Sequence, residues 1–322
     1  MTIPLTGMPL PDHAALLATL PDLGFTDVWS SEVNGADAFT PLALASAWSP
    51  RLRLGTAIVP VFTRGPGLLA MQAATLAEAA PGRVALGIGA SSPVVVGDWN
   101  AVEFDRPFER SRDLLRFLRP ALAGELVDGT FDTFTVRRFR LERPPAVPPK
   151  LLLAGLRGRM LRLAAAEADG AVLNWLSVGD VAKARAELAG APDGFEVAAR
   201  IFVCPTGDAA EARATARRLI AAYLTVPAYA AFHRWLGRGE VLKPMWDAWA
   251  TGDRKGALAA IPDKVVDELI VHGSPAQCRA HVERYAAAGV TTPVIALLPT
   301  RELAAGGATA LLDTLRELGA RS

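Results

Sequence analysis

The sequence predicts an α/β fold, a (β/α)8 TIM barrel with two excursions, at about residues 125–150 and 226–263. A unit of strand, loop and helix recurs about eight times, which favours a barrel over an open doubly wound sheet. The run 54–59 has no charge on either face, as in parallel sheets covered by helices. Barrels of this type reach 322 residues, so residues 1–322 are expected to form one domain.

In the N-terminal half, turn and cap residues mark the ends of the expected elements. Asp12 follows a proline and is an expected N-cap, and Gly24 is an expected helix stop. Pro41 marks the start of the next helix. The expected strands are 3–5, 25–30, 52–59 and 84–88, and the expected helices are 13–23, 40–48, 67–80 and 108–122.

The C-terminal half continues the alternation around the two excursions. Residues 125–150 combine an Asp-Gly pair, alternating aromatic and basic residues and a proline cluster, which predicts an extended excursion or hairpin over one barrel end. Residues 226–263 predict a helical excursion rich in aromatics. The expected strands are 151–154, 170–174, 197–203 and 294–298, and the expected helices are 157–168, 178–189, 208–224, 275–288 and 307–318.

Composition excludes several classes of function. The net charge of +1 gives no electrostatic reason to expect nucleic acid or an anionic membrane as partner. No apolar run is long enough to span a membrane, and the N-terminus lacks the pattern of a signal peptide, so a cytoplasmic location is expected. Cys204 and Cys278 fit no metal or redox spacing and are expected to be reduced thiols. The four histidines show no metal or triad spacing, so no metal site is expected.

Two stretches carry a family resemblance: GTAIVP at residues 55–60 and TRGPGLLAMQAATLAEAAPGRVALGIGAS at residues 63–91. They resemble the bacterial luciferase-like superfamily, in particular its oxidoreductases that use the deazaflavin coenzyme F420. The resemblance extends over residues 23–298. It implies a non-prolyl cis peptide between Ala57 and Ile58, which forms a bulge behind the deazaflavin ring.

The loop after strand 84–88 is rich in small residues. The run 87–92 lacks the third glycine of a dinucleotide fingerprint, so a Rossmann site is weakly supported. Small residues here let a planar ring approach the backbone; alternatively, the run is a tight turn that closes the strand. The resemblance assigns coenzyme contacts to Gly89, Ala90 and Ser91.

The segment after strand 151–154 opens a helix. Backbone N–H groups at a helix N-terminus bind anions, and the alternative is a solvated basic helix start. The resemblance assigns the coenzyme phosphate to this segment, through backbone more than side-chain contacts, at Gly155, Leu156, Arg157, Gly158, Arg159 and Met160. At the end of strand 170–174, Asn174 is expected to face the same site.

Glu32 follows strand 25–30, at an expected barrel mouth. Its carboxylate is the candidate catalytic group, as an acid–base residue or as a hydrogen-bond partner of the ring, and the alternative is a surface carboxylate or a helix cap. Several deazaflavin dehydrogenases have an Asp-His pair at this place. Val33 replaces the histidine here, which argues against oxidation of a sugar phosphate.

The resulting functional prediction is an F420-dependent oxidoreductase that transfers a hydride between the deazaflavin and a small, apolar or conjugated organic substrate. Large apolar residues near strand ends and in the second excursion favour such a substrate; alternatively, the aromatics of the excursion only seat it on the barrel. The rival functions are an FMN-dependent monooxygenase of the same superfamily and a non-catalytic flavin-binding member. The family resemblance also implies a homodimer. The large apolar residues that favour an apolar or conjugated substrate are Trp29, Phe62, Trp99, Trp175, Tyr229, Phe232, Trp235, Trp246 and Trp249.

Overall fold

The structure is a computed structural model that describes residues 1–319. The chain divides into two compact units. The first unit comprises Met1–Val172 and Leu188–Ala198, and the second comprises Leu173–Glu187 and the chain from Ala199 onward. That residues 1–322 form a single domain stays a prediction.

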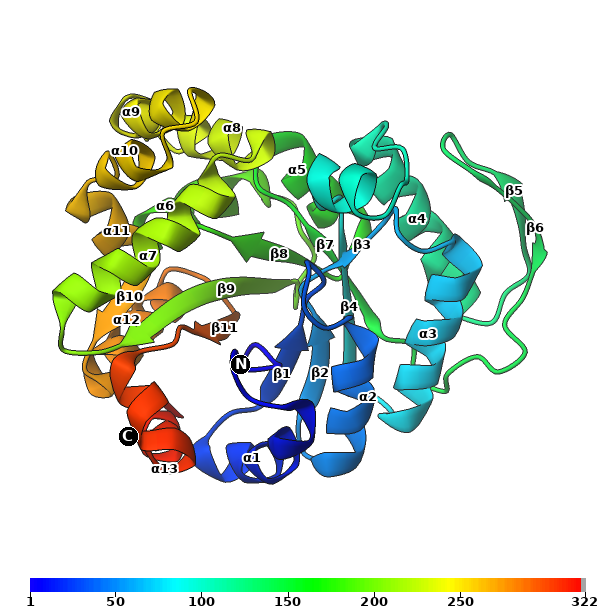
Figure 1. Ribbon diagram of the computed structural model, residues 1–322. Coiled ribbons are helices and arrows are strands. Elements are labelled where there is room, and N and C mark those ends of the chain that lie inside the picture. Colours follow the sequence, from blue (N-terminus) through cyan, green and yellow to red (C-terminus); the bar gives the residue numbers. More distant parts are fainter. Residues whose placement is uncertain (320–322) are drawn as a thin grey trace. The chain divides into compact units, whose positions relative to one another are not determined.

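The first unit is built on parallel strands in the hydrogen-bonding order β1-β2-β4-β7-β8, with the short β3 paired to β4 (Figure 1). Strand β4 is buried along its whole length, as expected for a parallel strand with neighbours on both sides and both faces covered. The strands are β1 (Asp27–Ser30), β2 (Arg53–Thr56), β3 (Val59–Pro60), β4 (Val84–Gly89), β7 (Lys150–Ala154) and β8 (Gly170–Asn174, whose last two residues belong to the second unit).

Helices follow the strands of the first unit in chain order. The predicted helix 13–23 is divided: α1 is followed by a 3-10 turn at Leu20–Leu23, where Pro21 has no N–H for an α-helical hydrogen bond. Gly24 ends this turn with φ +89°, as predicted. The helices are α1 (His13–Thr19), α2 (Phe39–Trp48), α3 (Pro66–Ala79), α4 (Pro107–Leu122) and α5 (Gly158–Glu167), with a 3-10 turn at Leu10–Asp12 and a π-helical turn at Val94–Asp98.

The predicted strand 3–5 is wrong. Only Thr2 forms an isolated bridge, with Trp29, and Ile3 donates its N–H to the carbonyl of Trp29 at 2.8 Å. Pro4 comes next and has no N–H with which to extend the ladder.

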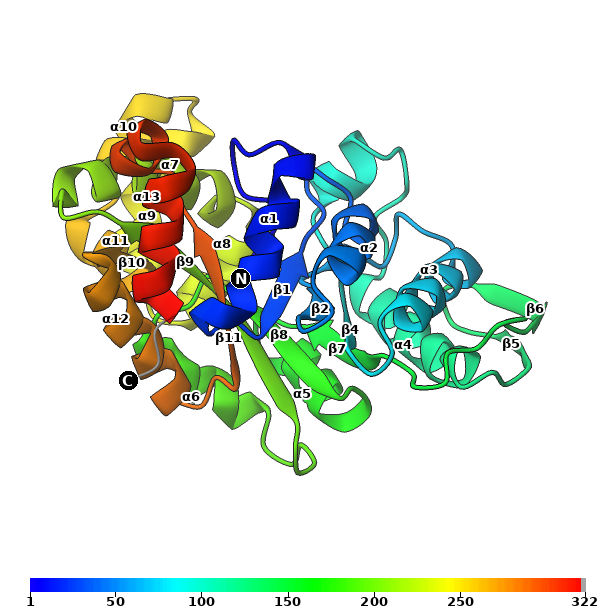
Figure 2. The ribbon, with the colours of Figure 1, turned by 90° about the horizontal axis from the view of Figure 1, so that it is seen from below.

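The first excursion is a hairpin, as predicted, but it packs along helices. Strands β5 (Val127–Thr130) and β6 (Thr135–Phe139) pair antiparallel and lie beside α3 and α4 (Figures 1 and 2). Phe117 of α4 contacts Phe131 and Phe134 edge-on, with ring centroids 6.4 and 6.2 Å apart. The prediction that this segment covers a barrel end is therefore wrong, because its aromatic residues bury themselves on α4.

Arg110 of α4 connects the turn of this hairpin to the loop after β3. Its Nε donates to the carbonyl of Val61 at 3.2 Å, and its Nη1 donates to the carbonyl of Thr133 at 3.5 Å. Its guanidinium also lies 4.8 Å from the ring centroid of Phe134. One side chain thus fixes two loops that are distant in sequence.

The second unit contains the remaining strands and helices. Strand β9 pairs with β10 in parallel and also with β11, and Asp208 caps α7 by accepting hydrogen bonds from the N–H groups of Ala210 and Glu211. Strand β10 has no counterpart among the predicted strands. The elements are α6 (Val178–Glu187), β9 (Glu196–Pro205, whose first residues belong to the first unit), α7 (Ala209–Leu224), α8 (Pro227–Trp235), α9 (Gly239–Ala250), α10 (Arg254–Ala259), α11 (Asp263–Leu269), β10 (Ile270–Gly273), α12 (Pro275–Ala287), β11 (Thr292–Leu297) and α13 (Arg301–Gly319).

The second excursion is helical, as predicted, and is formed by α8, α9, α10 and the start of α11. Its aromatic residues mostly hold these helices to their neighbours in the second unit. Trp246 donates its Nε1–H to the carbonyl of Leu224 at 2.8 Å, and Phe232 stacks on Trp235 at 6.0 Å. The guanidinium of Arg254 lies 3.8 Å from the ring centroid of Trp249.

The fold class is the predicted one, an α/β TIM-barrel type with parallel strands and intervening helices. Both cysteines are free and buried. Within residues 1–319, no helix has the length and apolar character needed to cross a membrane. The same residues contain no cluster of three or more His, Cys, Asp or Glu side chains able to hold a metal ion.

Gly87 provides a test of the packing in β4. Thr56 Oγ1 donates to the Gly87 carbonyl and accepts from the Gly87 N–H, both at 2.8 Å, and a Cβ at Gly87 would lie 2.1 Å from the Thr56 carbonyl oxygen. Gly87→Ala is therefore expected to destabilise the protein by roughly 3 kcal/mol or more, measured by urea unfolding. Gly129→Ala, in β5 with no atom within 4 Å of the new Cβ, is the matched control. Equal stability of the two variants would contradict this account.

Candidate active site

Two predicted site residues, Ala57 and Ile58, lie between β2 and β3 in the first unit. The peptide bond Ala57–Ile58 is cis, as the resemblance implied. Backbone hydrogen bonds attach this segment to the end of β1: Ala57 N–H donates to the Ser30 carbonyl at 2.7 Å, and Glu32 N–H donates to the Ile58 carbonyl at 3.3 Å. The structure therefore brings Glu32, Ala57 and Ile58 together.

Gly89 joins the same group from the end of β4. A Cβ at this position would lie 2.9 Å from the Cβ of Ala154 and 3.2 Å from Cγ1 of Ile58. The Gly89 carbonyl accepts a hydrogen bond from Val61 N–H at 2.9 Å. Gly89 at the end of β4 and Ala154 at the end of β7 thus pack closely with Ile58, just before β3, and these three residues form an apolar floor on which a larger residue at position 89 would collide with its neighbours.

Ala90 and Ser91 lead away from this floor. Ser91 has φ +65°, in the left-handed region that a residue with a side chain rarely adopts. The hydroxyl of Ser92 then accepts a hydrogen bond from Val95 N–H at 3.3 Å, at the start of the π-helical turn. Such strained residues and π-turns concentrate at functional sites, which fits the predicted role of this loop.

The predicted phosphate segment forms the start of α5. Gly155 packs closely on the helix, because a Cβ there would lie 2.8 Å from Cδ2 of Leu161. Arg157 is the N-cap residue, and its side chain makes no capping hydrogen bond. The first-turn N–H groups of a helix have no partner within the helix, so this start presents backbone donors.

The side chains of this segment are less suited to bind an anion. Arg159 pairs with Glu109 at 3.2 Å, and its guanidinium lies 3.6 Å from the ring centroid of Phe108. Met160 N–H donates to the Arg157 carbonyl at 3.3 Å. The Arg159 side chain is therefore already engaged, and the assignment of the coenzyme phosphate to this segment stays a prediction.

Glu32 is held by an arginine that the sequence analysis did not assign. Arg64 donates to both carboxylate oxygens of Glu32 at 2.5 Å, and Ala38 N–H donates to Oε1 at 2.9 Å. Both charged side chains are only 13% exposed. The carboxylate thus links the loop after β1 to the loop before α3, and the signal for this pair was an arginine in the loop after a neighbouring parallel strand.

Asn174 lies in the second unit and is hydrogen-bonded there to Tyr229. Its Nδ2 donates to the phenolic oxygen of Tyr229 at 3.0 Å, whereas its Oδ1 is buried without a hydrogen-bond partner. Burial raises the pKa of Tyr229 to about 12, so this phenol stays protonated at neutral pH. Sequence reasoning included Tyr229 only as one aromatic residue of an excursion.

The residue after Asn174 is part of an aromatic cluster. Trp175 has φ +57° and is almost fully buried, with its ring 4.4 Å from Phe202 and 5.1 Å from Tyr223. The guanidinium of Arg200 lies 4.9 Å from the ring centroid of Phe202, and its Nε is buried without a hydrogen-bond partner. Buried polar atoms of this kind are rare in proteins and are typical of sites that bind a polar group.

The aromatic residues expected near the site differ in their environments. Trp29 is 1% exposed and packs on Gly55, where a Cβ would lie 2.2 Å from the indole, so its expected place in a substrate pocket is wrong. Phe62 is nearly buried beside Phe104, at 5.0 Å between ring centroids. Trp99 is half exposed.

Comparison with known proteins identifies relatives of this chain. The sequence profile of the family described as luciferase-like monooxygenase matches residues 2–292. A Mycobacterium tuberculosis protein, provisionally named a coenzyme F420-dependent oxidoreductase, is 29% identical over 319 aligned residues, covering 89% of this chain and 91% of its own. A 5,10-methylenetetrahydromethanopterin reductase of Archaeoglobus fulgidus is 24% identical, covering 85% of each chain.

A solved structure shows the same fold. The coenzyme F420-dependent tetrahydromethanopterin reductase of Methanopyrus kandleri superposes with a TM-score of 0.78 at 18% identity, over 99% of this chain and 96% of its own. The agreement confirms the predicted TIM-barrel class. Since the family profile covers most of the sequence, the chain belongs to the luciferase-like monooxygenase family.

Proposed function

We propose that this protein is a coenzyme F420-dependent oxidoreductase. The observation that carries the proposal is the close packing of Gly89 against Ile58 and Ala154 at neighbouring strand ends, since it brings backbone and apolar side chains together where we propose that the planar ring lies. Relatives named for F420 use support the choice of coenzyme. When bound, the coenzyme supplies hydride transfer at its deazaflavin ring, and the protein supplies orientation and electrostatics.

Different residues would bind the ring and the phosphate of the coenzyme. Ile58, Gly89, Ala90 and Ser91 would contact the ring, together with Ala57. The start of α5, residues 155–160, would bind the phosphate through first-turn backbone N–H groups other than those of Gly155 and Met160, which already have carbonyl partners, supported by the helix dipole. The helix start fits the phosphate because the N-cap side chain does not occupy these donors.

Glu32 and Asn174 have the remaining proposed roles. Glu32, with its charge balanced by Arg64, would fix the loop behind the ring and accept a hydrogen bond from the ring or the substrate. In the second unit, Asn174 would contact the coenzyme through the Oδ1 that lacks a partner, and Tyr229, protonated at neutral pH, holds its amide in place.

The proposed substrate is a small, apolar or conjugated organic molecule. Support comes from the apolar character of Phe62 and Phe104 near the end of β3 and from Val33, 44% exposed, in place of a proton-abstracting histidine. The aromatics of the second excursion give little support, because most of them pack between helices. A homodimer and a cytoplasmic location complete the proposal.

An FMN-dependent monooxygenase is the second candidate, because the family profile is described by that activity. Titration of the apoprotein with F420 and with FMN separates the two. We expect F420 to bind with at least tenfold higher affinity, and the F420-loaded protein to reduce conjugated enones or quinones without oxidising glucose 6-phosphate. Tight FMN binding with oxygen consumption would support the rival function, and F420 binding without turnover of any donor or acceptor would favour a non-catalytic role.

The position of the phosphate is tested at Gly158. Gly158→Asp would place a negative charge at the start of α5 and should weaken F420 binding about tenfold or more, measured by fluorescence titration. Gly158→Ala is the control, because it shares the backbone strain at φ +32° without adding charge. Equal affinity of the two variants would exclude this helix start as the phosphate site.

Glu32 is tested beside its partner. Glu32→Gln keeps the shape of the side chain but leaves the guanidinium of Arg64 without a counter-charge, and we expect a loss of about 1–3 kcal/mol in the free energy of unfolding. Arg64→Gln removes the same ion pair from the other side. If Glu32 also contacts the coenzyme or substrate, Glu32→Gln should reduce F420 affinity or turnover more than Arg64→Gln does. Wild-type affinity and turnover in Glu32→Gln would end its proposed role.

A further inference from the structure

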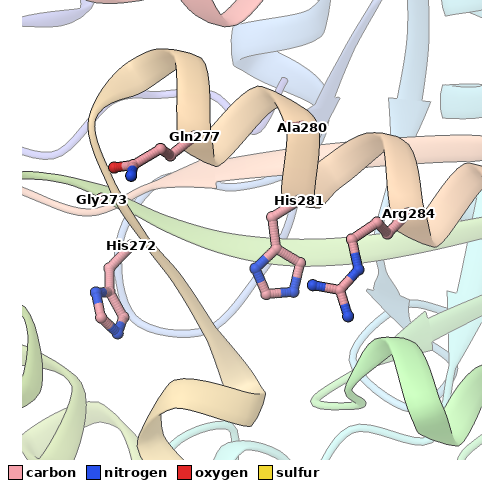
Figure 3. A pocket seen from close by; sticks show the side chains of 6 residues that line it. All are labelled: His272, Gly273, Gln277, Ala280, His281 and Arg284. Carbon is pink, nitrogen blue, oxygen red and sulfur yellow. The ribbon is translucent and has the colours of Figure 1, made fainter.

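A pocket of about 460 Å³ lies in the second unit, where β10 passes into α12 (Figure 3). None of its lining residues is assigned to the proposed coenzyme site. Six residues line it: His272, Gly273, Gln277, Ala280, His281 and Arg284. Its volume is in the range of pockets that bind small molecules.

Three of the lining side chains, those of His272, His281 and Arg284, can carry a positive charge. Gln277, His281 and Arg284 occupy positions i, i+4 and i+7 of α12 and therefore share one face of the helix. His272 joins them from β10, and the guanidinium of Arg284 lies beside the imidazole of His281 (Figure 3). Between them, Ala280 contributes only a methyl group to the pocket lining.

Asp267, the carboxylate that contacts His272, is shared with an arginine. Asp267 accepts a hydrogen bond from Nε2 of His272 at 2.9 Å, but it is also held in two places by Arg213, at 3.0 and 2.7 Å. Its charge is therefore shared with an arginine outside the pocket. With Nε2 engaged by Asp267, His272 would meet a ligand through Nδ1.

His281 is fixed in position and is disfavoured as a cation. Its ring stacks on Tyr285 at 5.9 Å between centroids. Burial lowers the pKa of His281, and the charges of Arg284 and His272 lower it further. Because the charges of Arg284 and His272 disfavour protonation of His281, an anion bound beside these groups would offset that repulsion.

We propose that this pocket binds a phosphate group, either inorganic phosphate or the phosphate of a small monoester. A tetrahedral dianion accepts hydrogen bonds from several directions, which suits donors that come from a strand and from two successive turns of a helix. Gln277 adds a carboxamide, whose Oε1 accepts from Ser274 N–H at 2.9 Å, so its amide N–H groups are the end available to a ligand. The proposal is independent of the coenzyme site.

Isothermal titration calorimetry on the whole protein tests the proposal, with inorganic phosphate, glycerol 3-phosphate and acetate as separate ligands. Phosphate or its monoester should bind at least tenfold more tightly than acetate. A preference for glycerol 3-phosphate over inorganic phosphate would identify a monoester as the ligand, and the reverse would identify the free ion. Equal affinity for acetate and both phosphates would overturn the assignment.

Variants locate the binding. Arg284→Gln and His281→Ala should each weaken phosphate binding about tenfold, the effect of one charge-assisted hydrogen bond, and Arg284→Lys should recover part of it. Arg279→Gln is the control on the same helix, because Arg279 donates to the Glu317 carbonyl outside the pocket. Unchanged affinity in Arg284→Gln, or an equal loss in Arg279→Gln, would overturn the site.

Histidine NMR provides a second readout that does not depend on calorimetry. Saturation with glycerol 3-phosphate should raise the pKa of His281, because the anion offsets the charges that face it: Arg284 on its own helix and His272 on β10, with Asp267 and Arg213 behind His272. A pKa of His281 that does not move at saturation would contradict the proposal.

Discussion

The close approach of backbone segments at three glycines is the constraint on which the first unit depends. Gly55 lies under the indole of Trp29, Gly87 exchanges hydrogen bonds with Thr56, and Gly89 lies between Ile58 and Ala154. At each position an added Cβ would come within 3 Å of another atom. Glycine here is not a source of flexibility, since each one sets the spacing of neighbouring strands and, at β4, the depth of the proposed ring-binding floor.

Helices and strands whose ends are marked by glycine, proline or capping residues were predictable from sequence. Strand 170–174 has the predicted bounds, and β4 extends the predicted 84–88 by one residue. The prediction was wrong or silent where local signals were ambiguous. Strand 3–5 contains a proline, and the apolar run 265–271 divides into the end of α11 and most of β10, which periodicity over so short a stretch cannot separate. The predicted helix 307–318 corresponds to the second part of α13, because Gly307, with non-helical φ 56° and ψ −141°, separates it from a helical segment that begins at Arg301.

Candidate site residues could be selected from loop composition, but not their partners. Glu32 and Arg64 are 32 positions apart, and Asn174 and Tyr229 are 55 apart. Sequence places each of them at a strand end or in an excursion, whereas the pairing depends on how the loops converge in space. The same limit applies to aromatic residues. Sequence does not distinguish a buried tryptophan near a strand end, such as Trp29 packed on Gly55, from a half-exposed one, such as Trp99.

Arg110 has a consequence for how the segment after β3 is held in place. Its side chain spans from the carbonyl of Val61 to that of Thr133, so the order of the segment after β3 depends on a hairpin contributed much later in the chain. A change in the length of that hairpin turn would remove one support of the segment without altering any residue in it. The segment after β3 is therefore supported by a hairpin that contributes no residue to the proposed coenzyme site.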